Sequence, residues 1–266
     1  MFLCCILFVT GSSIYAQMTE YILLFIVAFI ANAFLAFAGG GAGLLQLPLL
    51  IFLGLPFSIA LATHKLASVA LGIGATLRYF REDTVKWRFS LLILAAGVPG
   101  VVLGANIILF VPDRAAELAL GVLTMGLGVY SWLRKDLGLS DEPKHRNMAG
   151  YIVGGAVLFI IGALNGSLTS GTGLFVTLWL VRWFGLDYKQ AVAYTLVLVG
   201  LFWNGTGAIT LGLLSSIKWD WIPVLLVSSG IGGYIGAHMA IIKGSVRIKQ
   251  VFEVVTILVG IKLVMG

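Results

Sequence analysis

Lys65 lies in the middle of a long apolar run, SIALATHKLASVALGIGATLRYF, and its type and position predict chemistry. A charge in such a run is costly inside a membrane, so it usually faces a cavity and marks a functional site. Lysine is a compact point charge suited to an anion, and Ser68 lies three residues on, at a spacing that predicts a shared helix face. We therefore expect Lys65, Ser68 and the adjoining Thr63 and His64 to form part of an oxyanion site.

Two of these residues have structural alternatives. The flexible stem of Lys65 could carry its ammonium group to the membrane interface, about 12 Å away along the helix, without any role in binding. His64 precedes the lysine and is expected on a different face of the helix. There it could relay protons, or it could be a packed, hydrogen-bonded histidine. The sequence leaves both pairs of alternatives open.

Two glycine-containing segments precede short apolar runs and predict breaks in membrane helices. Residues 39–43 read Gly-Gly-Gly-Ala-Gly, and residues 169–173 read Thr-Ser-Gly-Thr-Gly. Glycine lets the backbone leave the helix, and the next helix then begins with unpaired N–H groups that attract anions. The alternative is that these glycines only permit close helix packing. The binding candidates in the two segments are Gly40, Gly41, Gly43, Thr169, Ser170, Gly171, Thr172 and Gly173.

The second half of the chain has no counterpart of Lys65, because Leu196 or a neighbour stands at its place. Its binding candidates are Thr195 and Asn204, of which Asn204 lies in the apolar stretch LFWNGTGAI. A side-chain amide in lipid must find a partner or line water. An interhelical hydrogen bond is the alternative role for each. Further polar residues of this half are Asn165, Tyr194 and Thr206.

The composition indicates what kind of protein positions these residues. Hydrophobic residues make up 60% of the chain and charged residues 11%, with a mean hydropathy of +1.06. A soluble domain is about 25% charged. We predict an all-α, polytopic transmembrane helical bundle. Its apolar runs lie at about residues 21–38, 42–54, 57–80, 88–111, 115–133, 150–166, 171–184, 188–212, 220–242 and 249–265.

The chain divides into two similar halves. After a signal-like or mis-called N-terminal extension over residues 1–17, we expect a first transmembrane repeat over 18–133, a connector over 134–149 and a second repeat over 150–266. GAGLLQLPLLIFLG, which begins at Gly41, corresponds to GTGLFVTLWLVRWFG, which begins at Gly171. Each half has about five segments, which is an odd number, so the two halves are expected to have opposite orientations in the membrane. An inverted repeat is therefore predicted, with the binding site where the halves meet.

The two short runs of this pattern, 42–54 and 171–184, are too short for a straight span. They either cross in a broken form or dip into the membrane and return along the preceding helix. The sequence does not decide between these alternatives.

The basic residues predict the orientation of the protein. Thirteen of the 17 lysines and arginines lie in the loops 78–88, 134–147, 182–189 and 243–249, all on one side of the expected bundle. The positive-inside rule places that side in the cytoplasm, so we expect a multi-pass protein of the plasma (inner) membrane. The net charge of +6 is thus explained by orientation rather than by nucleic-acid binding. Cys4 and Cys5 are adjacent and too close for an ordinary disulfide.

Three segments together resemble the TauE/SafE family of sulfite and organosulfonate exporters: GGGAGLLQLPLL, LATHKLASVALGIGATLRYFR and GSLTSGTGLFVTLWLVRWFGLDYKQAVAYT. The resemblance covers nearly all of residues 21–265. It is particularly similar to members with an Ala-Thr-Asn-Lys-Leu motif, which here reads Ala62-Thr63-His64-Lys65-Leu66. The resemblance implies a permease or exporter for a small sulfur-containing anion, working by secondary transport and alternating access. We expect no cofactor and no metal.

Two other classes of function stay open. An intramembrane serine hydrolase would use Ser170 and His238, although Leu168 stands where rhomboid proteases have a glycine. A non-transporting membrane assembly component would need a large soluble surface, and the longest loop is only 134–147. We expect that the protein is not an enzyme. The expected partners are a small anionic substrate and the lipid bilayer, without nucleic acid, and homo-oligomerisation is left open.

Overall fold

The predicted apolar runs form helices in the computed structural model, which describes residues 2–40, 43–80, 82, 85–108, 112–168 and 171–265. No strand occurs in this part of the chain. Helices suit a hydrocarbon environment because each satisfies its own backbone hydrogen bonds. The prediction of an all-α membrane bundle is confirmed. The first half consists of α1 (Phe2–Phe37), α2 (Gly43–Phe52), α3 (Phe57–Tyr79), α4 (Trp87–Ile107) and α5 (Asp113–Leu133).

The second half begins with α6 (Met148–Ser167) and α7 (Thr172–Phe184). A continuous helix then changes character along its length, from α8 (Tyr188–Tyr194) through a π-helix, η2 (Thr195–Trp203), to α9 (Asn204–Leu214). A short turn, η3 (Trp219–Trp221), leads into α10 (Ile222–Met265), which is kinked at Gly244, where φ is +70°. π-helical turns are rare and occur mostly at functional sites.

Six helical stretches of the described residues are long and apolar enough to cross a membrane. They are Met18–Phe37, Phe57–Tyr79, Phe89–Ile107, Met148–Ser167, Tyr188–Leu214 and Trp219–Lys262. Helices α2 and α7, with 10 and 13 residues, reach only about 15 to 20 Å. They are therefore too short to join this set.

The two short helices fold back along the helices that precede them. Gln46 of α2 lies 3.3 Å from Asn32 of α1, on the other side of the first glycine break. Trp183, near the end of α7, donates to the carbonyl oxygen of Gly150, near the start of α6, at 2.9 Å. Both contacts join residues of an antiparallel hairpin. Both segments therefore pack against the helices that precede them, and whether they span the membrane or re-enter it stays a prediction.

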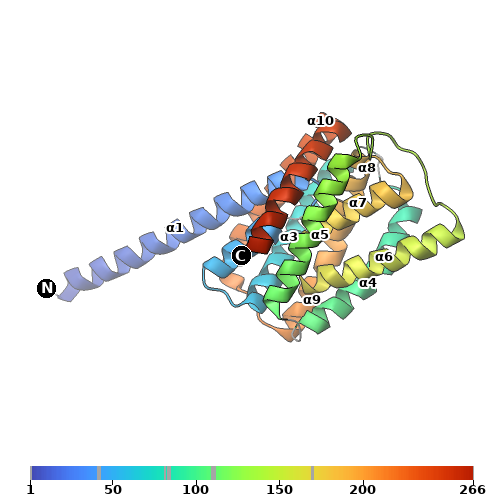
Figure 1. Cartoon of the computed structure of the whole chain (residues 1–266). Coiled ribbons are helices and arrows are strands. Elements are labelled where there is room, and N and C mark those ends of the chain that lie inside the picture. Colours follow the sequence, from blue (N-terminus) through green and yellow to red (C-terminus); the bar gives the residue numbers. More distant parts are fainter. Residues whose placement is uncertain are drawn as a thin grey trace.

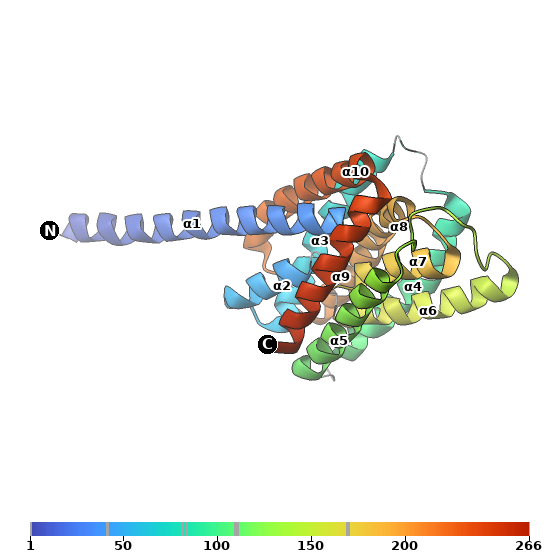
Figure 2. The same cartoon turned by 45° about the horizontal axis from the view of Figure 1, so that its top comes forward.

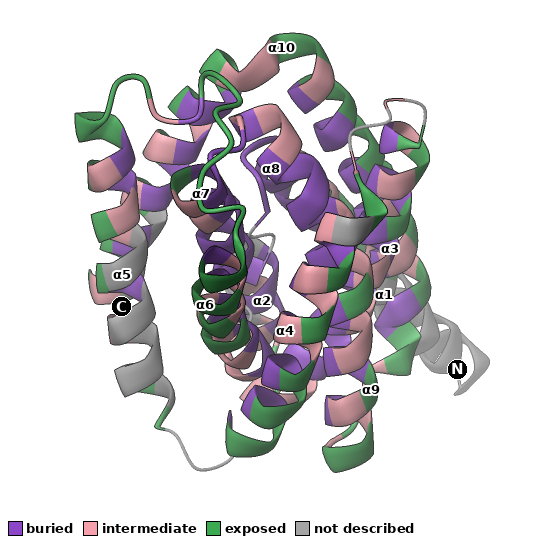
Figure 3. Cartoon of the chain, turned by 90° about the vertical axis from the view of Figure 1, so that its right-hand side faces the viewer, coloured by how far each residue is buried: buried purple, intermediate pink, exposed green. Residues whose placement is uncertain are grey.

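The helices of the two halves are interleaved. Helix α1 packs against α10, and α6 packs against α4, so that corresponding first helices each contact a helix of the other half. Helix α3 packs against both α10 and η2, while α7 and α8 lie inside the bundle (Figures 1 and 3). The N-terminal part of α1 projects beyond the other helices in both views (Figures 1 and 2). This exchange of partners fits two related halves, and the inverted repeat stays a prediction.

The basic loops lie together at one end of the bundle. The backbone N–H of Lys189 donates to Ser245 Oγ at 3.2 Å, and its ammonium lies 3.6 Å from Glu82. The connector joins the same end, because the N–H of Glu142 donates to the carbonyl oxygen of Gly185 at 2.8 Å. These contacts bring the loops 78–88, 134–147, 182–189 and 243–249 together. Which side of the membrane this end faces stays a prediction.

Candidate functional site

The two glycine breaks meet inside the bundle. Gly39 and Gly40, which end α1, both have φ of +103°, and Gly171, which precedes α7, has φ of +74°. An L side chain is strained in this region, so glycine is favoured. A methyl group on Gly40 would lie 3.2 Å from Cα of Gly173. Gly40 of the first break and the start of α7 are therefore in direct contact.

Two threonine hydroxyls fasten this contact. Thr177 of α7 donates to the carbonyl oxygen of Gly39 at 2.7 Å, and its Oγ1 lies 2.9 Å from Oγ1 of Thr195 in η2. Both threonines are buried. The break after α1 is thus held against α7 and the π-helix, which belong to the other half.

A cavity of about 40 Å³ lies beside the two breaks. This volume corresponds to roughly three water molecules, which is also the scale of a small oxyanion. The described residues that line the cavity include no carboxylate. They are Gly40, Gly43, His64, Ser68, Leu71, Asn165, Thr172, Gly173, Thr195, Leu196, Val199, Gly200 and Asn204.

The structure brings most of the predicted site residues to this cavity. Those that line it are Gly40, Gly43, His64, Ser68, Thr172, Gly173, Thr195 and Asn204. Thr63, Lys65 and Gly171 are not among its lining residues. Gly41, Thr169 and Ser170 lie outside the described residues. The binding roles of all these residues stay predictions.

Lys65 is fully buried and supports the cavity wall from behind. Its ammonium group donates to the backbone oxygen of Asn165 at 2.8 Å and to Oδ1 of the same residue at 3.1 Å. The last carbonyl groups of a helix attract cations, and Asn165 lies in the last turn of α6. Asn165 in turn donates to Thr172 Oγ1 at 2.8 Å. The snorkelling alternative is wrong, because the ammonium is held inside the bundle.

Ser68 pairs with His64 rather than with Lys65. Its Oγ lies 3.2 Å from Nε2 of His64, and Nδ1 of the same ring lies 3.0 Å from Gln46 Oε1. Residues four apart share a helix face as readily as residues three apart. The hydroxyl of Ser68 therefore bonds to the histidine rather than accompanying the lysine. His64 and Lys65 have different partners, Gln46 and Asn165, as different helix faces require.

A buried polar chain continues from His64 through residues that the sequence analysis did not single out. Asn32 Nδ2 lies 3.3 Å from Gln46 Oε1 and 3.1 Å from Ser229 Oγ. The side chains of Asn32, Gln46 and Ser229 have no exposed surface. A signal was present, because an amide inside an apolar run needs a partner, and Asn32 and Gln46 are both such amides.

Thr63 bonds to the loop that precedes η3. Its Oγ1 accepts a hydrogen bond from the backbone N–H of Lys218 at 3.0 Å. The contact ties α3 to the loop before η3, so Thr63 has a structural partner away from the cavity.

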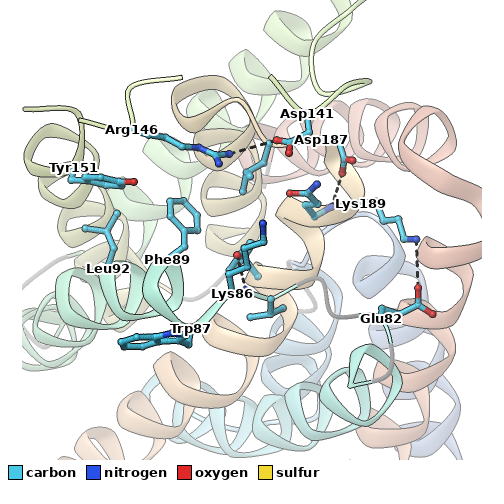
Figure 4. Close-up of a pocket in the computed structure, with 14 residues that line it drawn as sticks. Glu82, Lys86, Trp87, Phe89, Leu92, Asp141, Arg146, Tyr151, Asp187 and Lys189 are labelled. Carbon is cyan, nitrogen blue, oxygen red and sulfur yellow. Dashed lines mark hydrogen bonds and ion pairs between the residues drawn. The ribbon is translucent and has the colours of Figure 1, made fainter. Parts of the chain in front are cut away.

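A larger vestibule of about 1120 Å³ opens at the end of the basic loops (Figure 4). Arg146 lies 3.6 Å from Asp141 across its wall. Burial raises the pKa of the Asp187 carboxyl, whereas a hydrogen bond from Arg78 lowers the pKa of Glu82. The residues that line the vestibule are Glu82, Val85, Lys86, Trp87, Phe89, Leu92, Asp141, Arg146, Tyr151, Leu186, Asp187, Lys189, Gln190 and Tyr194.

Consecutive residues of one helix line the vestibule and the cavity. Tyr194 lines the vestibule, and the next residue, Thr195, lines the cavity. The Tyr194 ring contacts Phe89 edge to face, at 5.1 Å between centroids, and its hydroxyl accepts from the backbone N–H of Lys86 at 2.9 Å. Tyr194 and Phe89 thus form part of the vestibule wall, next in the chain to a segment that lines the cavity.

His238, the histidine of the hydrolase alternative, lies away from the cavity. Its Nδ1 accepts a hydrogen bond from Arg78 Nε at 2.9 Å, and its ring stacks on Tyr234. The serine of that alternative, Ser170, lies outside the described residues. In the part of the chain that the structure describes, no group of three or more His, Cys, Asp or Glu side chains could hold a metal ion.

Comparison with known proteins gives a consistent result. The sequence model of the family described as Sulfite exporter TauE/SafE matches residues 24–263. The "Probable membrane transporter protein ORF9" of Sinorhizobium sp. is 29% identical over 241 residues, covering 90% of each chain. A "Probable membrane transporter protein" of Haemophilus influenzae is 29% identical over 243 residues, covering 91% of this chain and 93% of the relative. The "Probable membrane transporter protein YunE" of Bacillus subtilis is 22% identical over 271 residues, covering 92% of this chain and 97% of the relative. No solved structure matches the chain.

Proposed function

Because the chain belongs to the TauE/SafE family and is a multi-pass membrane transporter, we propose that it carries sulfite or an organosulfonate across the plasma membrane by alternating access. The basic end of the bundle is then the cytoplasmic end. The protein acts without chemical conversion of its substrate and draws on a gradient. Binding takes place in the cavity between the two glycine breaks.

The observation that supports an anion is the set of groups around this cavity. The first turn of α7, with Thr172 and Gly173, forms part of its wall. Helix N-termini carry a partial positive charge that favours anions. Ser68, His64 and Asn204 add side chains able to donate hydrogen bonds.

The charge around the cavity also favours an anion. Lys65 lies behind the wall and is held by Asn165, and no carboxylate is among the lining residues that the structure describes. A buried anion needs such compensation, because its transfer from water into protein is costly. A cation would find no counter-charge there.

In this proposal Tyr194 and Phe89, which line the vestibule next to the cavity-lining segment, form a barrier between the two spaces. The vestibule is wide at its own end, while the cavity beyond the barrier is small. A solute that reaches the vestibule therefore needs the barrier to move before it can enter the cavity. The π-helix that follows Tyr194 provides a segment whose hydrogen bonds can rearrange.

The test is flux of radiolabelled sulfite and methanesulfonate into proteoliposomes that contain the purified protein. We expect uptake above that of protein-free vesicles, and we expect it to fall at least tenfold in Thr172→Val, which loses a hydroxyl at the cavity. Thr210→Val is the matched control, because the Thr210 hydroxyl bonds to the carbonyl oxygen of Thr206 and does not line the cavity. Equal flux in protein-free vesicles, or no difference between the two variants, would contradict the proposal.

A further inference from the structure

The hydrogen bonds around His64 determine which of its ring nitrogens carries the proton. Asn32 Nδ2 donates to the carbonyl oxygen of Ala28 at 2.6 Å, which fixes the orientation of the Asn32 amide. The second hydrogen of the same nitrogen is shared between Ser229 Oγ at 3.1 Å and Gln46 Oε1 at 3.3 Å. An NH2 group of Gln46 at that position would face another donor, so we assign the oxygen there. This oxygen lies 3.0 Å from Nδ1 of His64. Because an oxygen of this kind only accepts, Nδ1 carries the hydrogen.

The other ring nitrogen, Nε2, is then unprotonated and lies at the cavity. A neutral imidazole has one donor and one acceptor nitrogen, so Nε2 accepts from the Ser68 hydroxyl, 3.2 Å away. His64 and Ser68 both line the cavity, although His64 is only 1% exposed. A basic nitrogen therefore lies where the transported anion is proposed to bind.

Lys65 is the one charged residue near His64 in the described part of the chain. Its ammonium is engaged by Asn165, and the groups that pack around the histidine or complete the cavity wall are uncharged. These uncharged side chains are Asn32 of α1, Gln46 of α2, Ser68 of α3, Asn165 of α6, Thr172 of α7, Thr195 of η2, Asn204 of α9 and Ser229 of α10. Protonation of His64 is thus the available way to add positive charge when an anion enters.

Resting on the proposed function, we propose that His64 couples the anion to a proton. When the anion enters the cavity, Nε2 takes up one proton from the water on the side of entrance, forming an N–H bond as an O–H bond of hydronium breaks. The Ser68 hydroxyl is then released from Nε2 and donates to the anion. On the other side the anion leaves, Nε2 returns its proton to water, and Ser68 donates to Nε2 again. Anion and proton therefore cross together.

The experiment counts protons that accompany an anion with no proton of its own near neutral pH. Proteoliposomes are loaded with a fluorescent pH indicator, and a methanesulfonate gradient is applied. For the wild type we expect about one proton per anion inside the vesicles. We also expect the apparent affinity to fall as the pH rises between about 6 and 8, by at most about tenfold per pH unit, which is the limit for one proton taken up on binding.

The variants separate proton coupling from anion binding. His64→Asn and His64→Gln keep a polar group but cannot carry the proton, so the acidification and the pH dependence should both disappear. Ser68→Ala should bind the anion more weakly and still bring one proton with each anion. His238→Gln is the control, because that histidine contacts Arg78 and does not line the cavity. It should behave as the wild type does.

The outcomes distinguish this inference from the proposed function. Methanesulfonate flux without acidification in the wild type would overturn the coupling and leave anion transport standing. Undiminished acidification in folded His64→Asn would overturn it as well. If neither His64 variant folds, the proton count of the wild type alone decides. Absence of flux for both sulfite and methanesulfonate would overturn both.

Discussion

Gly40→Ala tests whether contact between the two glycine breaks is needed for transport. Gly40 has φ of +103°, and a methyl group there would lie 3.2 Å from Cα of Gly173 and 3.3 Å from Cγ2 of Thr195. The left-handed backbone costs an alanine about 1–2 kcal/mol. Overpacking of the contact adds about 1–3 kcal/mol and is relieved by moving the break away from α7. This displacement would deform the cavity wall that both glycines form.

The matched control is Gly54→Ala. Gly54 has φ of +93°, so its backbone strain is similar, but no heavy atom lies within 4 Å of an added methyl group. The two variants therefore share the strain and differ in the contact. We expect both to melt at lower temperature than the wild type, by similar amounts apart from the overpacking. Only Gly40→Ala should lose sulfite flux, by about tenfold or more if the contact costs at least ~1.4 kcal/mol.

The assay measures melting temperature and initial uptake of radiolabelled sulfite on the same purified samples. Uptake normalised to folded protein separates loss of transport from loss of fold. Equal uptake by folded Gly40→Ala and Gly54→Ala would refute the reasoning, because the contact at Gly173 would then be irrelevant to the pathway.

Two further predictions concern positions outside the glycine breaks. A methyl group on Gly207 would lie 2.6 Å from Cδ and 3.0 Å from Nζ of Lys65, so Gly207→Ala should lower both the melting temperature and the flux. Gly205→Ala is the control, because the nearest atom to a methyl group there is 3.8 Å away. It should lower neither quantity beyond the effect of helix propensity. Similar melting temperatures and fluxes for the two variants would contradict the role of Lys65 as support of the cavity wall. The Arg78 hydrogen bond holds the pKa of Glu82 below its ordinary 4.5, so its stabilisation is present above that pH and is lost as the pH falls through the lowered pKa. Melting temperatures should therefore differ between wild type and Glu82→Gln at neutral pH and converge in acid, and a difference that does not change with pH would contradict this.

The glycine breaks could be predicted because local rules decide them. Glycine clusters at matched places in the two halves, each followed by a run too short to cross, indicate broken helices without knowledge of any distant contact. The structure places Gly40 against Gly173, as two facing breaks require. The helical bundle could be predicted from composition, because the chain has too few charged residues to form the surface of a soluble domain.

The partners of Lys65 and Ser68 could not be predicted, because they depend on packing. Asn165 lies 100 residues from Lys65 in sequence, and no local pattern joins them. For Ser68, spacings of three and four residues are nearly equivalent on a helix, and the choice fell to His64 because Gln46 holds the other side of its ring.

The vestibule was not foreseen for a similar reason. Glu82, Asp141 and Asp187 come from three separate loops, whose charges the sequence could assign only to one side of the bundle. Their arrangement depends on backbone contacts such as that between Glu142 and Gly185, which form only when the connector docks on the turn after α7.

The most direct test of the central claim, that the transported anion binds in the cavity between the breaks, is sulfite flux in Asn204→Leu. Asn204 lines the cavity, and its Oδ1 is buried without a hydrogen-bond partner. Replacement by leucine therefore removes no hydrogen bond of Oδ1 from the folded protein. Asn106→Leu is the control, because Asn106 is exposed and bonds only to the carbonyl oxygen of Val102 within its own helix. We predict that Asn204→Leu melts no lower than the wild type yet loses about tenfold or more of its flux, as expected for a lost bond to a charged group, while Asn106→Leu keeps it. Wild-type flux in folded Asn204→Leu would contradict the account.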